Sequence, residues 1–217
     1  MERNRFSPQD ARRFYDFLGE RYDWFAGYEA RAKMVAMKCL ELQAGQRLLN
    51  VGVGTGKEHA ALQTVVAPQG AAFGLDLSPR MLAVAHKRTR SPLCRADGRY
   101  LPFAGGSFDR LYCTYVLDLV ATADLADWLG EFRRVLRPGG RIALVSLTEG
   151  VDLPSRALVR TWKMAYALSP LTCGGCRPLQ LSELARKAGF ERIERQVVVQ
   201  MGVPSEVIVA NTSWAEK

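Results

Sequence analysis

A glycine-rich turn and two later aspartates are the residues whose types and spacing could do chemistry in this sequence. The apolar run Leu48–Val51 leads into Gly52-Val-Gly-Thr-Gly56, and a helical pattern opens directly afterwards. Glycines allow a tight turn and close approach of a ligand to the backbone, and the helix that follows offers unpaired N–H donors. The next two candidate strands end near Asp76 and Asp97. This order predicts one ligand site at the ends of three strands.

The two aspartates fit different parts of a nucleoside. Asp76 can accept hydrogen bonds from both hydroxyls of a ribose, and Ser78 is already available to cap the helix that follows. Asp97 can accept a hydrogen bond from the exocyclic amine of adenine, with Met81 packed on the face of the base. The alternatives are a glycine turn that serves only the fold, and an Asp97-Gly98 pair that is merely a turn.

The residues around the turn do not match the motifs of two other kinds of nucleotide-binding site. A P-loop requires a glycine at position 51 and a serine or threonine at position 58, where the chain has Val51 and Glu58. A dinucleotide fingerprint places its third glycine where this chain has Lys57. A ligand that carries a pyrophosphate is therefore disfavoured, and with it a nicotinamide oxidoreductase.

The elements that must position these residues alternate between strand and helix patterns, which is typical of a mainly parallel sheet. Seven strands are expected, at Arg47–Val51, Ala71–Asp76, Leu93–Ala96, Phe108–Thr114, Arg141–Leu147, Glu191–Gln200 and Ser205–Ala210. The helices between them are expected at Lys57–Val66, Arg80–Arg88, Ala123–Leu136 and Leu179–Ala188, with a stop for the third at Arg137-Pro-Gly-Gly140.

The length of 217 residues and the 48% hydrophobic content predict one α/β domain over the whole chain, 1–217. Residues 1–42 are expected to form a helical segment, rich in aromatics, that covers the site. Residues 148–178 are too long for an ordinary connection and are expected to form a helical insertion that faces the substrate.

The ordered motifs closely resemble those of the class I S-adenosylmethionine (SAM)-dependent methyltransferases. Among the subfamilies, the sequence is most similar to the one containing the ubiquinone/menaquinone-biosynthesis C-methyltransferases and the phospholipid N-methyltransferases, a likeness strengthened by Tyr22-Asp-Trp-Phe25. As a set the motifs are specific for the cofactor and say little about the substrate. They lie at 49–56, 74–82, 96–98, 101–103, 107–109 and 134–140.

This resemblance implies a three-layer Rossmann-like fold, with helices on both faces of a seven-stranded sheet whose last strand is antiparallel. It also implies that SAM lies across the carboxyl ends of the first strands and leaves as S-adenosylhomocysteine. The cofactor contacts that it implies are Gly52, Gly54, Thr55 and Gly56 at the methionine part, Asp76 at the ribose, Asp97 and Gly98 at the adenine, Thr114 at the sulfonium, and Tyr22 as a cover. Leu77, Met81 and Ala96 are expected to be further cofactor contacts.

Asn50 departs from the family pattern, because the position two residues before the first glycine is usually acidic. An amide still accepts a hydrogen bond from the amino group of methionine, but it supplies no counter-charge, so a lower affinity for the cofactor is expected. Methyl transfer needs a general base only if the nucleophile must lose a proton. The catalytic residue is unknown, and Asp118, after the fourth strand, is a weak candidate against the alternative of a capping or surface carboxylate.

The net charge, the cysteines and the distribution of apolar residues indicate which partners and which location to expect. The formal net charge of +8 comes from basic residues spread along the chain, so binding to nucleic acid is not expected. Five cysteines form no disulfide framework, and Cys173-Gly-Gly-Cys176 lacks a second pair for a metal site. No long apolar run is present, and a cytoplasmic protein is expected. Aromatics interleaved with arginines in the N-terminal segment leave a weak association with a membrane surface open.

Two functions remain as hypotheses. The first is methyl transfer from SAM to a small or lipid-like acceptor, such as a quinol, a phospholipid or an aromatic metabolite. The alternative is a catalytically silent module that binds SAM or S-adenosylhomocysteine as a sensor or scaffold. The oligomeric state is not readable from the sequence.

Overall fold

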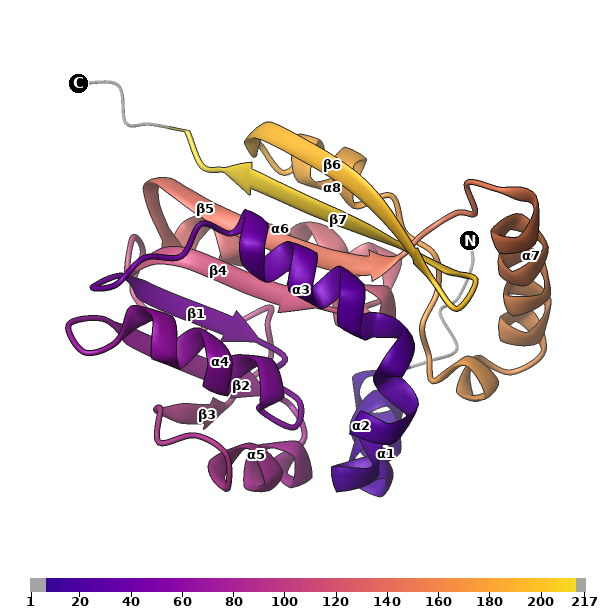
Figure 1. The fold of residues 1–217 in the computed structure, drawn as a ribbon, viewed down its shortest axis with the longest axis horizontal. Helices are drawn as coiled ribbons and strands as arrows, with labels where there is room; N and C mark the ends of the chain where they lie inside the picture. The colour runs from indigo at the N-terminus through magenta and orange to yellow at the C-terminus, as the bar shows by residue number, and fades with distance from the viewer. Residues whose placement is uncertain (1–6, 214–217) are drawn as a thin grey trace.

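One seven-stranded sheet forms the centre of the molecule in the computed structural model, which describes residues 7–213 (Figure 1). Residues 1–6 and 214–217 of the predicted domain, and the side chain of Phe25, lie outside the described residues. The strand order is β3-β2-β1-β4-β5-β7-β6. The strands are β1 (Arg47–Val51), β2 (Ala71–Asp76), β3 (Leu93–Arg95), β4 (Phe108–Thr114), β5 (Leu136–Leu147), β6 (Glu191–Gln200) and β7 (Val203–Asn211).

Strands β1 to β5 pair in parallel, and β7 runs antiparallel between β5 and β6. The predicted sheet with an antiparallel last strand is therefore confirmed. Central parallel strands are covered on both faces, so they read as continuous apolar runs rather than alternating ones. In β1, four of the five residues are buried, which explains why its bounds were predictable.

Helices cover both faces of this sheet. On one face lie α3 (Ala30–Cys39) and α4 (Lys57–Val66), as Figure 1 shows. Their buried residues, such as Ala36 and Leu62, pack in one cluster with residues of β1, β4 and β5. On the other face α6 (Leu125–Val135) and α8 (Leu181–Lys187) contribute Phe132, Leu129 and Leu181 to the larger core cluster. The short helix α5 (Pro79–His86) packs Leu82 and Ala85 on Val53 beside the glycine-rich turn.

The described part of the N-terminal segment is helical, and its first helices, α1 and α2, lie at the carboxyl ends of the strands (Figure 1). It consists of α1 (Pro8–Leu18), a 3-10 turn, α2 (Tyr22–Phe25), a second 3-10 turn and α3. Ser7 starts α1, because its hydroxyl accepts from the N–H of Asp10 while the Asp10 carboxylate accepts from the N–H of Ser7.

The predicted helix stop at Arg137-Pro-Gly-Gly140 needs a correction. Strand β5 already begins at Leu136, which pairs with Phe108, and the register shifts before Arg110 pairs with Arg141. The four residues are therefore an irregular start of a strand rather than a free turn after a helix. Helix α6 is also shorter than predicted, because a 3-10 turn at Thr122–Asp124 precedes it.

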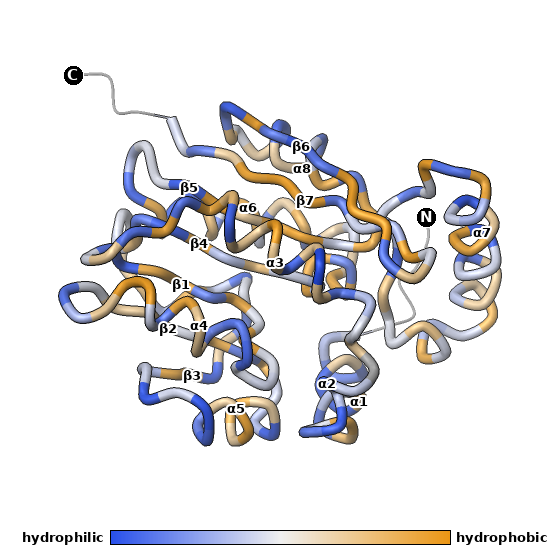
Figure 2. Tube along the Cα trace, viewed as in Figure 1, coloured by the Kyte–Doolittle hydropathy of each residue, from blue (hydrophilic) through white to orange (hydrophobic). Residues whose placement is uncertain are grey.

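The insertion between β5 and α8 holds α7 (Leu153–Leu168) and a 3-10 turn (Pro170–Cys173). Helix α7 stands beside the sheet at its carboxyl edge in Figure 1, and in Figure 2 its tube mixes hydrophilic and hydrophobic residues. A hydrogen bond connects α7 to the segment that follows it, because the indole N–H of Trp162 donates to the carbonyl of Cys176 at 2.9 Å. Within residues 7–213 no helix combines the length and the apolar character needed to cross a bilayer.

Candidate functional site

A cleft lies at the carboxyl ends of β1, β2 and β4, and the N-terminal helices α1 and α2 also line it, through residues such as Tyr15 and Tyr22. It brings together residues that are far apart in the sequence, including all the predicted cofactor contacts except Gly56. Those that line it are Tyr22, Asn50, Gly52, Gly54, Thr55, Asp76, Leu77, Met81, Ala96, Asp97, Gly98 and Thr114. No residue of 148–178 is among its lining residues.

The glycines of the turn serve different purposes. Gly52 has φ +74°, and a Cβ there would lie 2.2 Å from a methyl carbon of Val116, so no larger residue fits. Gly54 has open space at the corresponding point, which leaves its backbone accessible to a ligand. Gly56 precedes α4 with φ +80° and approaches Ala85 so closely that a Cβ would lie 2.8 Å away. Its role in the structure is to pack the turn against α5.

Asp76 ties this turn to β2. Its Oδ2 accepts from the Gly54 N–H at 2.9 Å, and its Oδ1 accepts from the Ser78 N–H at 2.9 Å. Burial raises the pKa of this carboxyl, although these hydrogen bonds act in the opposite direction. Because a carboxylate oxygen accepts more than one hydrogen bond, both oxygens keep acceptor capacity for a ligand in the cleft.

Asp97 is paired with an arginine that also lines the cleft. Arg99 Nη2 lies 2.8 Å from Asp97 Oδ2, and its Nη1 lies 3.2 Å from Asp124. Burial raises the pKa of Asp97, but the hydrogen bonds from Arg99 outweigh it and the pKa is lowered. Gly98 lets Trp128 approach, because a Cβ there would lie 2.2 Å from the indole ring. The carboxylate is thus held ionised at the wall of the cleft.

A cluster of charged residues on α3, on α4 and in the 3-10 turn before α3 forms another part of the wall. Lys33 Nζ lies 2.7 Å from the buried carboxylate of Glu29 and 3.7 Å from Glu58 Oε1. The Tyr22 hydroxyl donates to Glu29 at 2.8 Å, so it is already engaged. Burial lowers the pKa of Lys33, but Glu29 and Glu58 outweigh it and the pKa is raised. Lys33 and Glu58 therefore present opposite charges to the cleft, which they both line.

Asn50 lines the cleft next to this cluster. Its Nδ2 lies 3.4 Å from Nδ1 of His59, a fully buried residue. Burial lowers the pKa of His59 to about 4, so the ring is neutral at pH 7. The structure thus places His59 beneath the turn as a packed, uncharged group.

Polar contacts hold the N-terminal helices over the cleft. The Thr55 hydroxyl donates to Asp23 Oδ1 at 2.7 Å, and Arg88 Nη1 donates to Asp23 Oδ2 at 2.6 Å. Burial raises the pKa of Asp23, but these two donors outweigh it and the pKa is lowered. Because its hydroxyl is used in this way, Thr55 can meet a ligand chiefly through its backbone.

Comparison with known proteins decides the family. The family model described as Methyltransferase domain matches residues 49–144. The demethylmenaquinone methyltransferase of Staphylococcus aureus is 32% identical over 178 residues, which cover 77% of this chain and 70% of the relative. The chain belongs to the SAM-dependent methyltransferase family.

A 37.1 kDa protein of a Streptomyces fradiae transposon is 34% identical over 73% of this chain. The chain spans about half the length of the first curated relatives it matches, 47% in this case.

Solved structures show the same methyltransferase fold. The methyltransferase bound to the Trm112 methyltransferase activator of Haloferax volcanii has a TM-score of 0.75 at 18% identity, with 95% of this chain and 99% of that chain covered. The cyclase SpnF has a TM-score of 0.72 at 17% identity, with 96% and 97% covered. At these identities the likeness concerns the fold alone.

Asp118 of this methyltransferase lies away from the cleft. It is fully buried and is not among the lining residues, whereas its neighbours Leu119 and Val120 are. Its Oδ2 accepts weakly from the Leu147 N–H at 3.4 Å, and its buried Oδ1 has no hydrogen-bond partner. Burial raises its pKa to about 7. The structure therefore offers no direct route from this carboxyl to a bound acceptor.

Several further residues line the methyltransferase cleft although the sequence did not single them out, among them Lys33, Glu58, Arg99 and Tyr115. Arg99 had a local signal, since it lies two positions after Asp97. Lys33 had none, because it lies far before the turn in the chain. Tyr115 follows β4 with φ +54°, and its hydroxyl lies 2.6 Å from that of Ser205. A bulky residue in this backbone region indicates local strain, which the packing around the cleft must hold.

The Cys173-Gly-Gly-Cys176 segment forms a turn below α7, where the Cys176 N–H donates to the Cys173 carbonyl at 3.0 Å. Across residues 7–213, no three histidine, cysteine or acidic side chains cluster as metal ligands would.

Proposed function

We propose that this chain transfers a methyl group from SAM to a small or lipid-like acceptor with an apolar body. The observation that carries the proposal is the single cleft in which the glycine-rich turn, Asp76 and Asp97 meet. SAM, when bound, supplies an electrophilic methyl group on a sulfonium. The other contributions below are those of the chain's own residues.

The nucleoside part of the cofactor fits the groups around β2 and β3. Asp76 has spare acceptor capacity for the ribose hydroxyls. Asp97 can accept from the adenine amine while it stays paired with Arg99. Leu77, Met81 and Ala96 provide apolar surface for the base. Gly52, Gly54 and Thr55 offer backbone to the methionine part, and Gly56 fixes the turn that presents them.

Lys33 and Glu58 complement the charges at the methionine end. The ammonium of Lys33 suits the cofactor's carboxylate, and the carboxylate of Glu58 suits its amino group. Asn50 adds an acceptor oxygen when His59 Nδ1 accepts from its amide N–H. Glu58, eight residues later in the chain, thus supplies the counter-charge that Asn50 lacks. The expected loss of affinity from Asn50 is reduced accordingly.

The chain contributes to the reaction mainly by alignment and exclusion of water. Transfer from a sulfonium is an in-line displacement in which charge is neutralised, so a preorganised, dry cleft serves it well. Tyr22, Thr114 and Tyr115 all line the cleft, and their side chains would exclude water from a bound cofactor. An acceptor that is already nucleophilic, or that is deprotonated in solution, needs no base from the protein.

The acceptor's class is supported by the lining and by the relatives. Leu119, Val120 and Ala121 provide an apolar wall that suits a ring or chain. The name of the Staphylococcus aureus relative points to a prenylated quinone precursor. A quinol is therefore the first acceptor to test, followed by a phospholipid and an aromatic metabolite.

The first experiment is isothermal titration with S-adenosylhomocysteine, together with a turnover assay that uses methyl-labelled SAM and the three acceptor classes. Binding in the micromolar range and label transfer to one acceptor are expected. Absence of binding at about millimolar ligand would overturn the proposal, because that affinity corresponds to only about 4 kcal/mol.

The second candidate is a silent module that binds SAM without turnover. Asn50 favours it, as does the cyclase SpnF, which has the same fold and is not named a methyltransferase. Binding of S-adenosylhomocysteine without label transfer to any component of a cell extract would support this candidate. Transfer to any acceptor would exclude it.

A further inference from the structure

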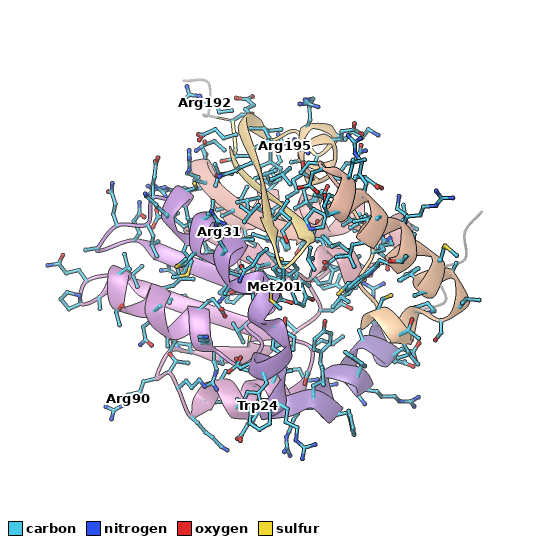
Figure 3. The ribbon with its side chains drawn as sticks, turned by 45° about the vertical axis from the view of Figure 1, so that its right-hand side comes forward. Trp24, Arg31, Arg90, Arg192, Arg195 and Met201 are labelled. Atoms are coloured by element: carbon cyan, nitrogen blue, oxygen red, sulfur yellow. The ribbon has the colours of Figure 1, made fainter. Side chains whose placement is uncertain are left out.

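The large apolar side chains that are exposed in this protein gather on one side. Among the described residues, eight of the eleven belong to α1, α2, the α7 region or the turn between β6 and β7, all toward the carboxyl edge of the sheet (Figure 1). Figure 3 turns this side forward and shows Trp24 and Met201 on it. The eight residues are Phe17, Trp24, Val151, Leu153, Met164, Leu168, Leu171 and Met201.

Helix α7 carries the densest part of this set. Leu153 is 81% exposed, Met164 63% and Leu168 84%. At about 100° per residue, these three and Ala157 fall within about 60° of one another around the helix axis and form one lengthwise stripe. The opposite face, with Ser155 and Val159, is buried against the protein.

A basic stripe runs beside the apolar stripe on α7. Arg156, Arg160 and Lys163 are all exposed and occupy the neighbouring sector of the helix. The sequence of α7 contains no acidic residue between Leu153 and Leu168. Lys163 forms an ion pair with Glu149 at the start of the insertion, and the other two keep their charge at the surface. The helix thus presents parallel apolar and cationic rows to solvent.

We propose that α7 docks this protein on the surface of a bilayer that contains anionic phospholipids. Apolar side chains of such a helix enter the boundary between headgroups and acyl chains, while the basic row is attracted to the negative surface. A protein partner with an apolar groove would account for the apolar stripe of α7 but not for the basic stripe beside it. The two rows together, on a chain of net charge +8, match the chemistry of an anionic membrane.

This surface differs from the one that the sequence suggested. Tyr15 and Tyr22 of the N-terminal segment line the cleft, and their rings contact each other at 5.7 Å. They are therefore unavailable to a membrane. Among the described side chains of α1 and α2, Phe17 and Trp24 are the large apolar ones that are exposed and can add to the contact made by α7. Docking through α7 does not depend on the proposed methyl transfer.

The experiment is co-sedimentation of the full chain with vesicles of phosphatidylcholine alone and with vesicles of which about one-third is phosphatidylglycerol. We expect binding to the anionic vesicles, with a loss of at least tenfold at about 0.5 M salt. The variant Leu153→Ser/Met164→Ser/Leu168→Ser removes the apolar row and should lower binding by at least tenfold. Arg156→Gln/Arg160→Gln should lower binding to anionic vesicles only.

The matched control is Met34→Ser/Val65→Ser, which removes two exposed apolar side chains elsewhere and should bind vesicles like the wild type. Titration with S-adenosylhomocysteine checks that each variant is folded, so a failure of the proposed function is distinguished from a failure of docking. Equal binding by the wild type and both α7 variants would overturn the proposal. So would a wild-type dimer that binds no vesicles and that the apolar-row variant converts to a monomer.

Discussion

The carboxylate of Asp76 has two roles at the residue scale, because it fixes the glycine-rich turn and keeps acceptor capacity toward the cleft. We expect Asp76→Ala to weaken the binding of S-adenosylhomocysteine by more than tenfold, about 1.4 kcal/mol or more. Calorimetry measures this effect, and Asp127→Ala on the exposed side of α6 is the control. A change of less than twofold would contradict the ribose role.

Lys33 and Glu58 should affect only ligands that carry the amino-acid part. Lys33→Met and Glu58→Gln are each expected to weaken S-adenosylhomocysteine about tenfold, since each removes one charged hydrogen bond. Binding of 5′-methylthioadenosine, which lacks the amino acid, should stay within about twofold of the wild type.

The control for this pair is Lys38→Met, an exposed lysine on the same helix. Lys33→Met also leaves Glu29 buried without its partner, so a lower melting temperature is expected for that variant. An equal loss of affinity for both ligands would show that the variants act through the fold and not through the methionine end.

At the scale of elements, the N-terminal helices depend on charged contacts rather than on a deep core. Helix α1 buries none of its residues completely, and Asp23 holds α2 to both Thr55 and Arg88. We expect Asp23→Asn to weaken the binding of S-adenosylhomocysteine severalfold at about 0.05 M salt. At about 0.5 M salt the difference from the wild type should shrink, because salt screens the lost ion pair.

A second ion pair between the N-terminal segment and the end of α5 provides the comparison. Lys87 and Glu20 lie 2.6 Å apart, but both are largely exposed, and such pairs contribute little. Glu20→Gln should therefore leave the affinity unchanged at either salt concentration. A loss as large as that of Asp23→Asn would mean that general surface charge, and not the contact at the turn, holds the helices over the cleft.

For the whole molecule, Asp118 links folding to pH. Burial raises its pKa to about 7 in the native state, whereas the pKa is about 4 in an unfolded chain. Between about pH 4 and about pH 7 the carboxyl therefore keeps its proton in the native state but has lost it in the unfolded state. The free energy of unfolding should therefore fall as the pH rises from about 4 to about 7 and level off above it. Asp118→Asn should remove this fall and raise the free energy of unfolding at pH 8 by about 2 kcal/mol or more.

Denaturant titrations at pH 5 and pH 8 measure this effect. Asp127→Asn, at an exposed position of α6, is the matched control and should follow the wild type. If Asp118→Asn instead abolished turnover while its stability profile matched the wild type, the buried carboxyl would have a role in the reaction after all.

A strand or helix could be predicted from the sequence where neighbouring residues define it, and could not where contacts between distant segments define it. The bounds of β1, β2, β4 and β6 agreed with those expected from the sequence. In β1 and β2 a largely apolar run between turn residues defines the strand locally. The start of β5 was wrong, since the pairing of Leu136 with Phe108 is a contact between distant segments. Local patterns do not carry such information.

The same distinction applies to the site. By itself the sequence determined the family fold and the order of the turn, Asp76 and Asp97, because glycine conformations and strand ends follow from neighbouring residues. Only the tertiary structure decided that Lys33 meets Glu58, that Asp118 turns into the core, and that α7 leaves an apolar and a basic row uncovered. Side-chain burial and charge pairing depend on which elements pack together, and that is a property of the folded chain.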